Sequence, residues 1–194
     1  MKKYLLATAL VATCACAHTT SSDQTVFFES LLSLCQQGEA YSGRVVSTDE
    51  ADAAFAEETL IAHFRSCAAD EIRIPFHVGE DRSRTWVLTP TETGLRLKHD
   101  HRHEDGSEDT ITQYGGDTGG EGSATRQEFP ADQYSKDLFV QEGLNVSVSN
   151  VWAIEFDPDR DLFAYELRRP NRDFRVEFDL ASPVASPPPP WGAE

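Results

Sequence analysis

FRVEFDL, residues 174–180, decides the fold of this chain, because apolar and charged residues alternate along it without exception. A period of two places every second side chain on one face of a β-strand, so that one face lies in a core and the other in water. EIRIPFHV, residues 71–78, alternates in the same way over its first part. This pattern is typical of antiparallel sheets.

Similar runs fill most of the chain around these two stretches. Tight connections such as Glu92-Thr93-Gly94, Asp105-Gly106 and the hairpin turn 157–161 separate them, and Asp-Gly is among the strongest hairpin signals. A long meander tends to close on itself, since closure removes exposed sheet edges. The sequence therefore predicts a mainly all-β protein, an antiparallel up-and-down meander closed into a barrel. The predicted strands are 43–46, 60–67, 71–78, 84–91, 94–103, 109–114, 124–129, 151–157, 162–169 and 174–180.

Helical segments interrupt this series of strands. Apolar residues recur at helical spacing over 26–35, and Ser22 or Asp23 can cap the start of that N-terminal helix. Residues 47–50 have the S-x-x-E form of a capping box ahead of a short Ala-rich helix. The second main helix is predicted over 130–142.

Two Gly- or Pro-rich segments fit neither a strand nor a helix. GGDTGGEG, residues 115–122, is expected to form a flexible loop between strands. Residues 183–194 are expected to form an extended Pro-rich tail of polyproline II type. Trp191 either pins this tail to the body of the protein or lies with it in solvent.

The N-terminus has the three parts of a secretory signal peptide, a basic start, an apolar run and small residues, over residues 1–17. Cleavage after Ala17 follows an A-x-A site, whereas a bacterial lipoprotein would instead be lipidated at Cys14 or Cys16. Residues 18–25 would then be a polar tether. We expect one β-barrel domain over 26–182, in a protein exported to the bacterial periplasm, to the outer membrane as a lipoprotein, or outside the cell.

Export makes the remaining cysteines informative. Cys35 and Cys67 form an even pair, which predicts a disulfide in an oxidising compartment. The loop that it closes is worth about 3–4 kcal/mol in the chain-entropy account. The alternative is two separate buried thiols, since free cysteine packs as a small hydrophobic residue.

The chain is acidic, with 33 Asp and Glu against 17 Lys and Arg and a formal net charge of −16. Such a surface repels phosphate backbones and anionic lipid headgroups. We therefore expect no nucleic-acid partner, membrane contact only through a lipid anchor, and a small molecule as the candidate partner.

A histidine-rich stretch, LRLKHDHRHEDGSEDT at 95–110, carries the candidate site. If its first part is a strand, one face begins apolar and continues with histidines toward the rim of the core. This face contains Leu95, Leu97, His99, His101 and His103. The ligand-lining interpretation assigns His99, His101 and His103, together with Tyr114, to the wall of a binding site.

A metal site is the second interpretation of the same stretch. His101 and His103 are close enough to share one ion, and zinc accepts such a pair. A two-residue turn would place Glu108 beside His103, and a three-residue turn that includes Ser107 would place Asp109 there instead. A plain solvated hairpin is the third interpretation.

No catalytic motif, neither a G-x-S-x-G nucleophile elbow nor an H-E-x-x-H metal motif, occurs in the sequence. The strand series resembles the calycin, or lipocalin-like, barrels, although Gly43 lacks the tryptophan that follows two residues later in true lipocalins. Residues 71–118 and 166–192 are also similar to uncharacterised exported bacterial proteins, many of them called lipoproteins. That resemblance implies an envelope location.

The function expected from these observations is a non-enzymatic, exported envelope protein that binds a small ligand in or at the mouth of its barrel. One alternative is a mononuclear metal protein or metallohydrolase that uses His101 and His103 with Glu108 or Asp109, with zinc as its cofactor. Another alternative is a structural envelope component.

Overall fold

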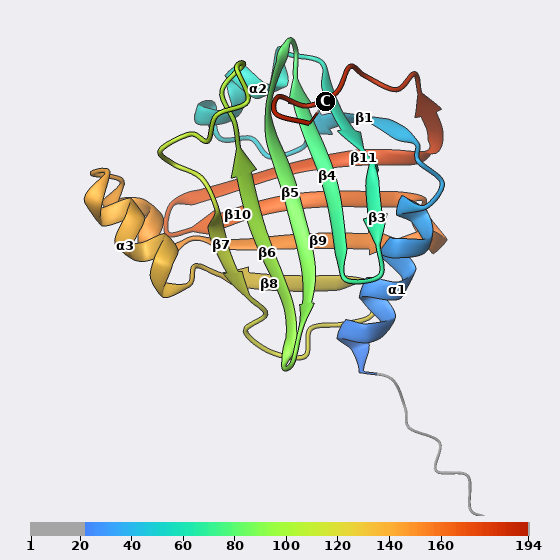
Figure 1. Ribbon diagram of the computed structural model, residues 1–194, viewed down its shortest axis with the longest axis horizontal. Coiled ribbons are helices and arrows are strands. Elements are labelled where there is room, and N and C mark those ends of the chain that lie inside the picture. The colour runs from blue at the N-terminus through green and yellow to red at the C-terminus, as the bar shows by residue number, and fades with distance from the viewer. Residues whose placement is uncertain (1–21, 194) are drawn as a thin grey trace, which may run out of the picture.

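Eleven antiparallel strands form one sheet that curls into a nearly closed barrel (Figure 1). This computed structural model describes residues 22–193. The predicted all-β barrel is therefore confirmed. The strands are β1 (Ala40–Val45), β2 (Leu60–His63), β3 (Ser66–Ala68), β4 (Glu71–Val78), β5 (Asp81–Thr91), β6 (Gly94–His101), β7 (Tyr114–Asp117), β8 (Arg126–Pro130), β9 (Val151–Asp157), β10 (Leu162–Arg169) and β11 (Arg172–Val184).

Two meanders make up most of the barrel. Strands β4 to β7 form one and β8 to β11 the other, and the pair β1–β2 joins them through the order β7-β6-β5-β4-β2-β1-β11-β10-β9-β8. The strands of the first meander run across those of the second (Figure 1). The predicted strand 60–67 is in fact two strands, because β2 pairs with β1 and β4 whereas β3 pairs with β4 alone.

The barrel closes where β7 meets β8, and the prediction was wrong there. Residues 109–113 form no strand, and the first residues of the segment predicted as a flexible loop, Gly115 to Asp117, lie in β7. Two hydrogen bonds cross from this segment to the β8 region. The amide of Asp132 donates to the carbonyl of Gly115 at 2.9 Å, and that of Gly119 donates to the carbonyl of Glu128 at 3.3 Å.

Close approach of the main chains explains why glycines form this strand. A Cβ atom on Gly115 would lie 1.9 Å from the carbonyl oxygen of Leu97, and one on Gly116 would lie 1.8 Å from that of Pro130. A side chain at either position would therefore push β7 away from a neighbour. The glycine run indicates tight packing here.

Helix α1 (Asp23–Cys35) closes one end of the barrel, on the side opposite α3 (Figure 1). Ser22 caps the helix by accepting from the amide of Thr25 at 3.2 Å, so the polar segment predicted over 18–25 already becomes helical at Asp23. Phe27 and Leu31 are completely buried in the core. None of the helices within residues 22–193 combines the length and hydropathy of a membrane-spanning segment.

A disulfide joins Cys35, the last residue of α1, to Cys67 in β3, with 5.7 Å between the two Cα atoms. The predicted pairing is therefore confirmed. The bond fixes the C-terminal end of α1 against the sheet, next to the core that the helix covers.

Short helices surround the opposite end of the barrel. They are η1 (Glu50–Asp52), α2 (Ala53–Ala56), α3 (Gln133–Gln141) and η2 (Asn145–Ser149). The predicted capping box is wrong in one respect, because Asp49 caps η1 by accepting from the amide of Ala51. Ser47 instead donates to the Asp52 carboxylate and accepts from the amide of Arg175, which ties this segment to β11.

The C-terminal segment lies on the outer face of the barrel. Strand β11 continues to Val184, and the Pro-rich stretch then folds back along the β4–β5 side (Figure 1). The amide of Trp191 donates to the carbonyl of Arg82 at 3.1 Å, and the Arg82 guanidinium donates to the carbonyl of Pro189 at 2.9 Å. Of the two alternatives for Trp191, the docked one is observed. A turn, η3 (Pro158–Arg160), joins β9 to β10 as expected.

Candidate ligand-binding site

Four strands turn from apolar to polar on their inward faces at the same end of the barrel. Inward residues of β5, β6, β10 and β11 end there in Arg84, His101, Arg169 and Arg172. Antiparallel pairing brings these residues together, since Arg84 lies directly opposite His101 and Arg169 directly opposite Arg172. The end of the barrel away from α1 is therefore a polar mouth above an apolar interior.

A cavity of about 260 Å³ opens at this mouth. The volume lies just below the usual range for small-molecule sites, roughly 300–1,000 Å³, so it suits a small ligand. Side chains of the barrel wall, of α2, of the segment before β7 and of the α3–η2 region form its lining. They are Phe55, Phe76, Arg84, Trp86, His99, His101, Ile111, Tyr114, Phe139, Leu144, Ser147, Asn150, Trp152, Tyr165, Leu167, Arg169, Arg172 and Phe174.

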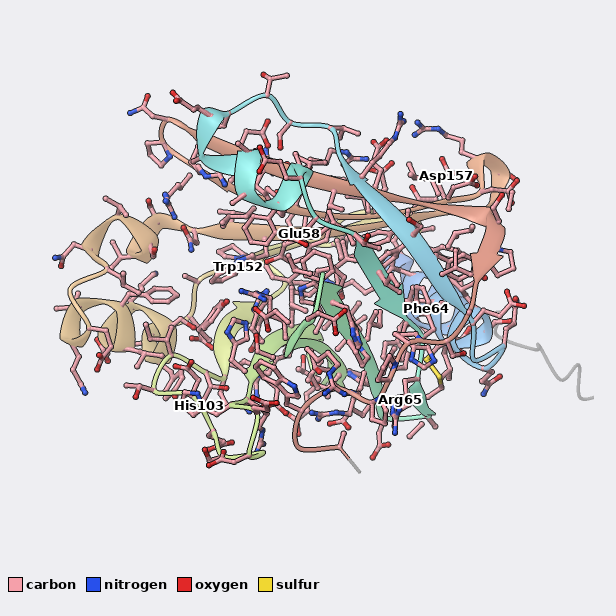
Figure 2. All side chains as sticks on the ribbon, turned by 90° about the horizontal axis from the view of Figure 1, so that it is seen from above. Glu58, Phe64, Arg65, His103, Trp152 and Asp157 are labelled. Atoms are coloured by element: carbon pink, nitrogen blue, oxygen red, sulfur yellow. A yellow bond between two sulfur atoms is a disulfide. The ribbon has the colours of Figure 1, made fainter. Side chains whose placement is uncertain are left out.

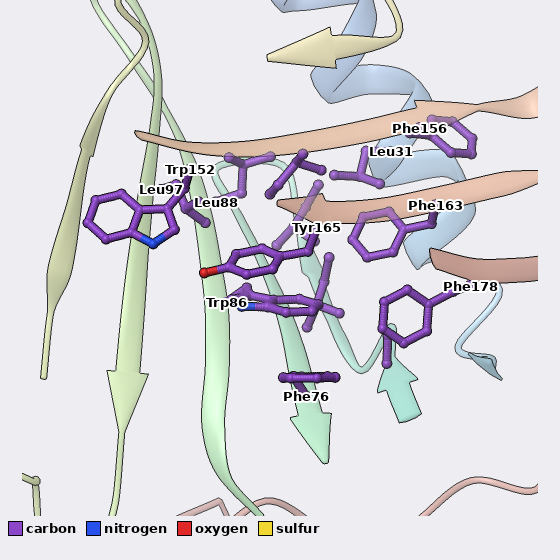
Figure 3. Packing of buried hydrophobic residues seen from close by; sticks show 14 of the residues in the cluster. Leu31, Phe76, Trp86, Leu88, Leu97, Trp152, Phe156, Phe163, Tyr165 and Phe178 are labelled. Atoms are coloured by element: carbon purple, nitrogen blue, oxygen red, sulfur yellow. The ribbon is translucent and has the colours of Figure 1, made fainter. Parts of the chain in front are cut away.

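Stacked aromatic rings form one side of the cavity. Trp86 lies between Phe76 and Tyr165, with ring centroids 4.7 Å and 4.4 Å away and interplanar angles of 14° and 15°. Figure 3 shows these three side chains as successive parallel layers, with Trp152 to one side. Aromatic pairs in this geometry stabilise each other, and their faces present a flat apolar surface.

His99 is buried in the interior, with 2 % of its surface exposed. Its Nδ1 lies 3.1 Å from the carbonyl oxygen of Tyr114 and its Nε2 lies 2.8 Å from the hydroxyl of Tyr165. A carbonyl only accepts, so Nδ1 carries the proton and Nε2 accepts from Tyr165. Burial lowers the pKa of His99 to about 3, and the ring is therefore neutral at pH 7.

His101 follows on the same strand face and lies closer to the rim. Its Nε2 is 3.2 Å from the hydroxyl of Tyr114, whose ring stacks on His99 at a centroid distance of 4.5 Å. Burial and then the positive charge of Arg84 lower the pKa of His101 to about 4, and burial raises the pKa of Tyr114. His101 and Tyr114 therefore present uncharged polar groups to the cavity at neutral pH.

The structure places three of the four predicted ligand-lining residues, His99, His101 and Tyr114, on the wall of the cavity. His103 is not among the lining residues. Strand β6 ends at His101, and His103 is exposed in the turn that follows, at the periphery of the molecule (Figure 2). The inward face of this strand therefore includes His99 and His101 but not His103.

The hairpin register differs from both predicted registers. The amide of His103 donates to the carbonyl of Ser107, so the turn contains Glu104, Asp105 and Gly106. This register places Arg102 opposite Glu108, and its guanidinium pairs with that carboxylate at 3.1 Å.

The proposed metal ligands are consequently not brought together. Glu108 faces Arg102, Asp109 accepts from the amide of Ile111, and His101 points to Tyr114 inside the cavity. Within residues 22–193, no three His, Cys, Asp or Glu side chains are grouped as metal ligands would be. The arrangement of these donors does not fit zinc, which needs three or four of them around one point.

The cavity also contains residues that sequence reasoning missed, above all Trp86, Trp152, Tyr165, Arg169 and Arg172. A signal for some of them was present in LFAYELRR, residues 162–169. Its inward face begins with apolar side chains and ends in arginine, which is the same change that singled out the histidine strand.

The charged groups of the cavity wall are all positive. Within the described chain, the cavity wall contains three arginines and two neutral histidines but no carboxylate. This contrasts with the acidic composition of the whole chain. Comparisons of the sequence and the structure with known protein families, curated proteins and solved structures find no match for this chain.

Proposed function

We propose that this protein is an exported binding protein that holds a small, mainly apolar ligand in the aromatic cavity at the open end of its barrel. The observation that carries the proposal is the cavity of about 260 Å³ between the Phe76–Trp86–Tyr165 stack and Trp152. Small barrels hold ligands in this position, and flat aromatic walls favour a planar ligand.

Binding is favoured over catalysis by the state of the polar groups. His99 is saturated by Tyr165 and by the carbonyl of Tyr114, and its side chain is neutral. No carboxylate or thiol lies among the described lining residues, so the wall offers no acid–base pair of the usual kind.

Isothermal titration calorimetry with 2-naphthamide, a neutral bicyclic probe, tests the proposal. The wild-type protein is expected to bind one equivalent. Leu167→Trp is expected to abolish binding, because Leu167 is a lining residue opposite Trp152 and Phe174 and the larger ring would fill the space. Val146→Trp is the matched control, since Val146 is 65 % exposed and not part of the lining.

Equal binding by wild type and Leu167→Trp would overturn the proposed site, and failure of a panel of apolar planar compounds to bind wild type would overturn the proposed function. Export rests on the leader-like residues 1–17 and on the oxidised Cys35–Cys67 pair. The intact mass of protein expressed with this leader in a bacterium tests it. A full-length mass would contradict export, whereas a chain that begins at His18, or a lipid-modified Cys14 or Cys16, would support it.

A further inference from the structure

Arg169 is a cation without an anion in the wall of the cavity. Its Nη1 donates to the side-chain oxygens of Asn150 at 3.2 Å and Ser147 at 3.4 Å, and both partners are neutral. Within residues 22–193, no carboxylate lies within 4.0 Å of its guanidinium, although acidic residues outnumber basic ones about twofold in this chain. The charge is therefore left uncompensated at a site where the chain could have paired it.

The neighbouring cations at the mouth are different, because each has its own partner. Arg172 pairs with Asp52 and lies 3.7 Å from Asp49. Arg84 pairs with Asp81 at 2.5 Å. Of the three arginines that line the cavity, only Arg169, which lies directly opposite Arg172 in the β10–β11 ladder, has no carboxylate partner within residues 22–193.

This arrangement has an energetic cost in the empty protein. Like charges directly opposite each other on antiparallel strands destabilise the pair, and a half-buried guanidinium without a counter-charge adds to that cost. A planar anion bound at the mouth would remove both penalties. The guanidinium matches a carboxylate in shape, since its donors form a flat fork.

The deeper part of the cavity excludes charge. Both ring nitrogens of His99 are hydrogen-bonded, to the hydroxyl of Tyr165 and the carbonyl of Tyr114, and the hydroxyl of Tyr114 lies against His101. Most of the remaining deep wall is aromatic. A ligand that fits both regions has an uncharged planar body and one anionic end.

We propose that the ligand is an amphipathic carboxylate, an aromatic or similarly flat body carrying one carboxylate group, and that Arg169 binds this group at the cavity mouth. The proposal rests on the proposed function, because it assigns the ligand class for the same cavity. It identifies Arg169 as the specificity-determining residue.

The test compares 2-naphthoate with 2-naphthamide, which have nearly the same shape but differ in charge at pH 7.5. Binding of both to wild type, Arg169→Gln, Arg169→Lys and Lys136→Gln is measured by calorimetry. Lys136→Gln is the matched control, because Lys136 is an exposed cation of α3, also without an ion pair in the described chain, and is not a lining residue. Thermal unfolding of each variant verifies that it is folded.

Wild type is expected to bind the carboxylate about tenfold to a hundredfold more tightly than the amide, as charge-assisted hydrogen bonds imply. Arg169→Gln is expected to remove this preference, so that the two probes bind it with similar affinities. Arg169→Lys should retain part of it, and Lys136→Gln all of it. Equal affinity of wild type for the two probes, or an unchanged preference in Arg169→Gln, overturns the role of Arg169 while the binding function stands. Binding of neither probe overturns both proposals.

Discussion

Tyr165 and His99 are joined by a hydrogen bond of 2.8 Å that crosses the interior of the barrel. The two residues are 66 positions apart in the chain, on β10 and β6, and five strands separate these two in the sheet order. The bond therefore links opposite walls directly, at the floor of the cavity, in addition to the ladders that link neighbouring strands.

Loss of this bond should destabilise the fold. Tyr165→Phe leaves Nε2 of His99 buried without a donor, and an unsatisfied buried acceptor costs about 1–3 kcal/mol. The free energy of unfolding from urea denaturation is the measurement. Tyr114→Phe is the comparison, because its hydroxyl faces the more exposed His101, where water can replace it, and a loss below about 1 kcal/mol is expected. A larger loss in Tyr114→Phe than in Tyr165→Phe would contradict this assignment.

Stability should fall as the pH is lowered from 6.5 to about 4.5. Burial lowers the pKa of His99 to about 3 and the pKa values of His77 and His101 to about 4, from the ordinary value of 6.5. In this window the unfolded chain binds more protons than the folded one. Each histidine then reduces the free energy of unfolding by at most about 1.4 kcal/mol per pH unit.

Urea denaturation at several pH values measures this slope. His101→Asn should decrease it by the contribution of one histidine, since Asn does not titrate. Carboxylates such as Asp81 and Asp132, whose pKa values are held below 3.8 in the folded protein, lose their contribution below this window. A flat profile between pH 4.5 and 6.5 would show that the histidines are not buried as described.

Gly116→Ala should disrupt the contact between β7 and β8. The added Cβ would lie 1.8 Å from the carbonyl oxygen of Pro130, so that the main chain must move. Overpacking of this kind costs about 2–3 kcal/mol, measurable as a lower thermal midpoint. Gly120→Ala is the control in the same segment, because a Cβ there meets nothing within 4 Å. An equal loss of thermal stability in the two variants would contradict close packing between β7 and β8.

Removal of the disulfide should destabilise the protein by about 3–4 kcal/mol. Cys35 and Cys67 are 32 residues apart, and the entropy of closing a loop of this size gives that value. Cys35→Ser with Cys67→Ser, compared with wild type by urea denaturation, measures the difference. Dithiothreitol should lower the stability of wild type and leave the double variant unchanged. An effect of the reductant on the double variant would point to another cause.

Regular alternation was the part of the sequence that predicted structure well. FRVEFDL (174–180) and the first part of EIRIPFHV (71–78) alternate in burial as they do in sequence, because a half-buried strand has a period of two. VWAIEFD (151–157) and LFAYELRR (162–169) are also strands with the predicted bounds, although they alternate less and much of each is buried on both faces. The N-terminal helix and the Cys35–Cys67 pair were predictable for similar reasons, a helical period and an even cysteine count.

Features that depend on tertiary contact were not predictable. Gly115 and Gly116 look like a loop in isolation and form a strand only because two neighbouring main chains approach them. The turn at 104–106 follows from the pairing of His103 with Ser107, which local sequence leaves open. Part of the site could be predicted from the sequence, since the alternation along their strand identified His99 and His101 as lining residues. Arg169 could not be identified in this way, because its lack of a carboxylate partner depends on its neighbours in space.

Because α1 closes one end of the barrel, it determines how the proposed ligand would enter and leave the cavity. Phe27 and Leu31 fill one end of the barrel, so within residues 22–193 the cavity opens at the mouth beside α3 and η2. A competing ligand can then enter only after the bound ligand has dissociated through the same opening. Displacement in a stopped-flow chase should then proceed at a single rate that does not change with the concentration of the competitor.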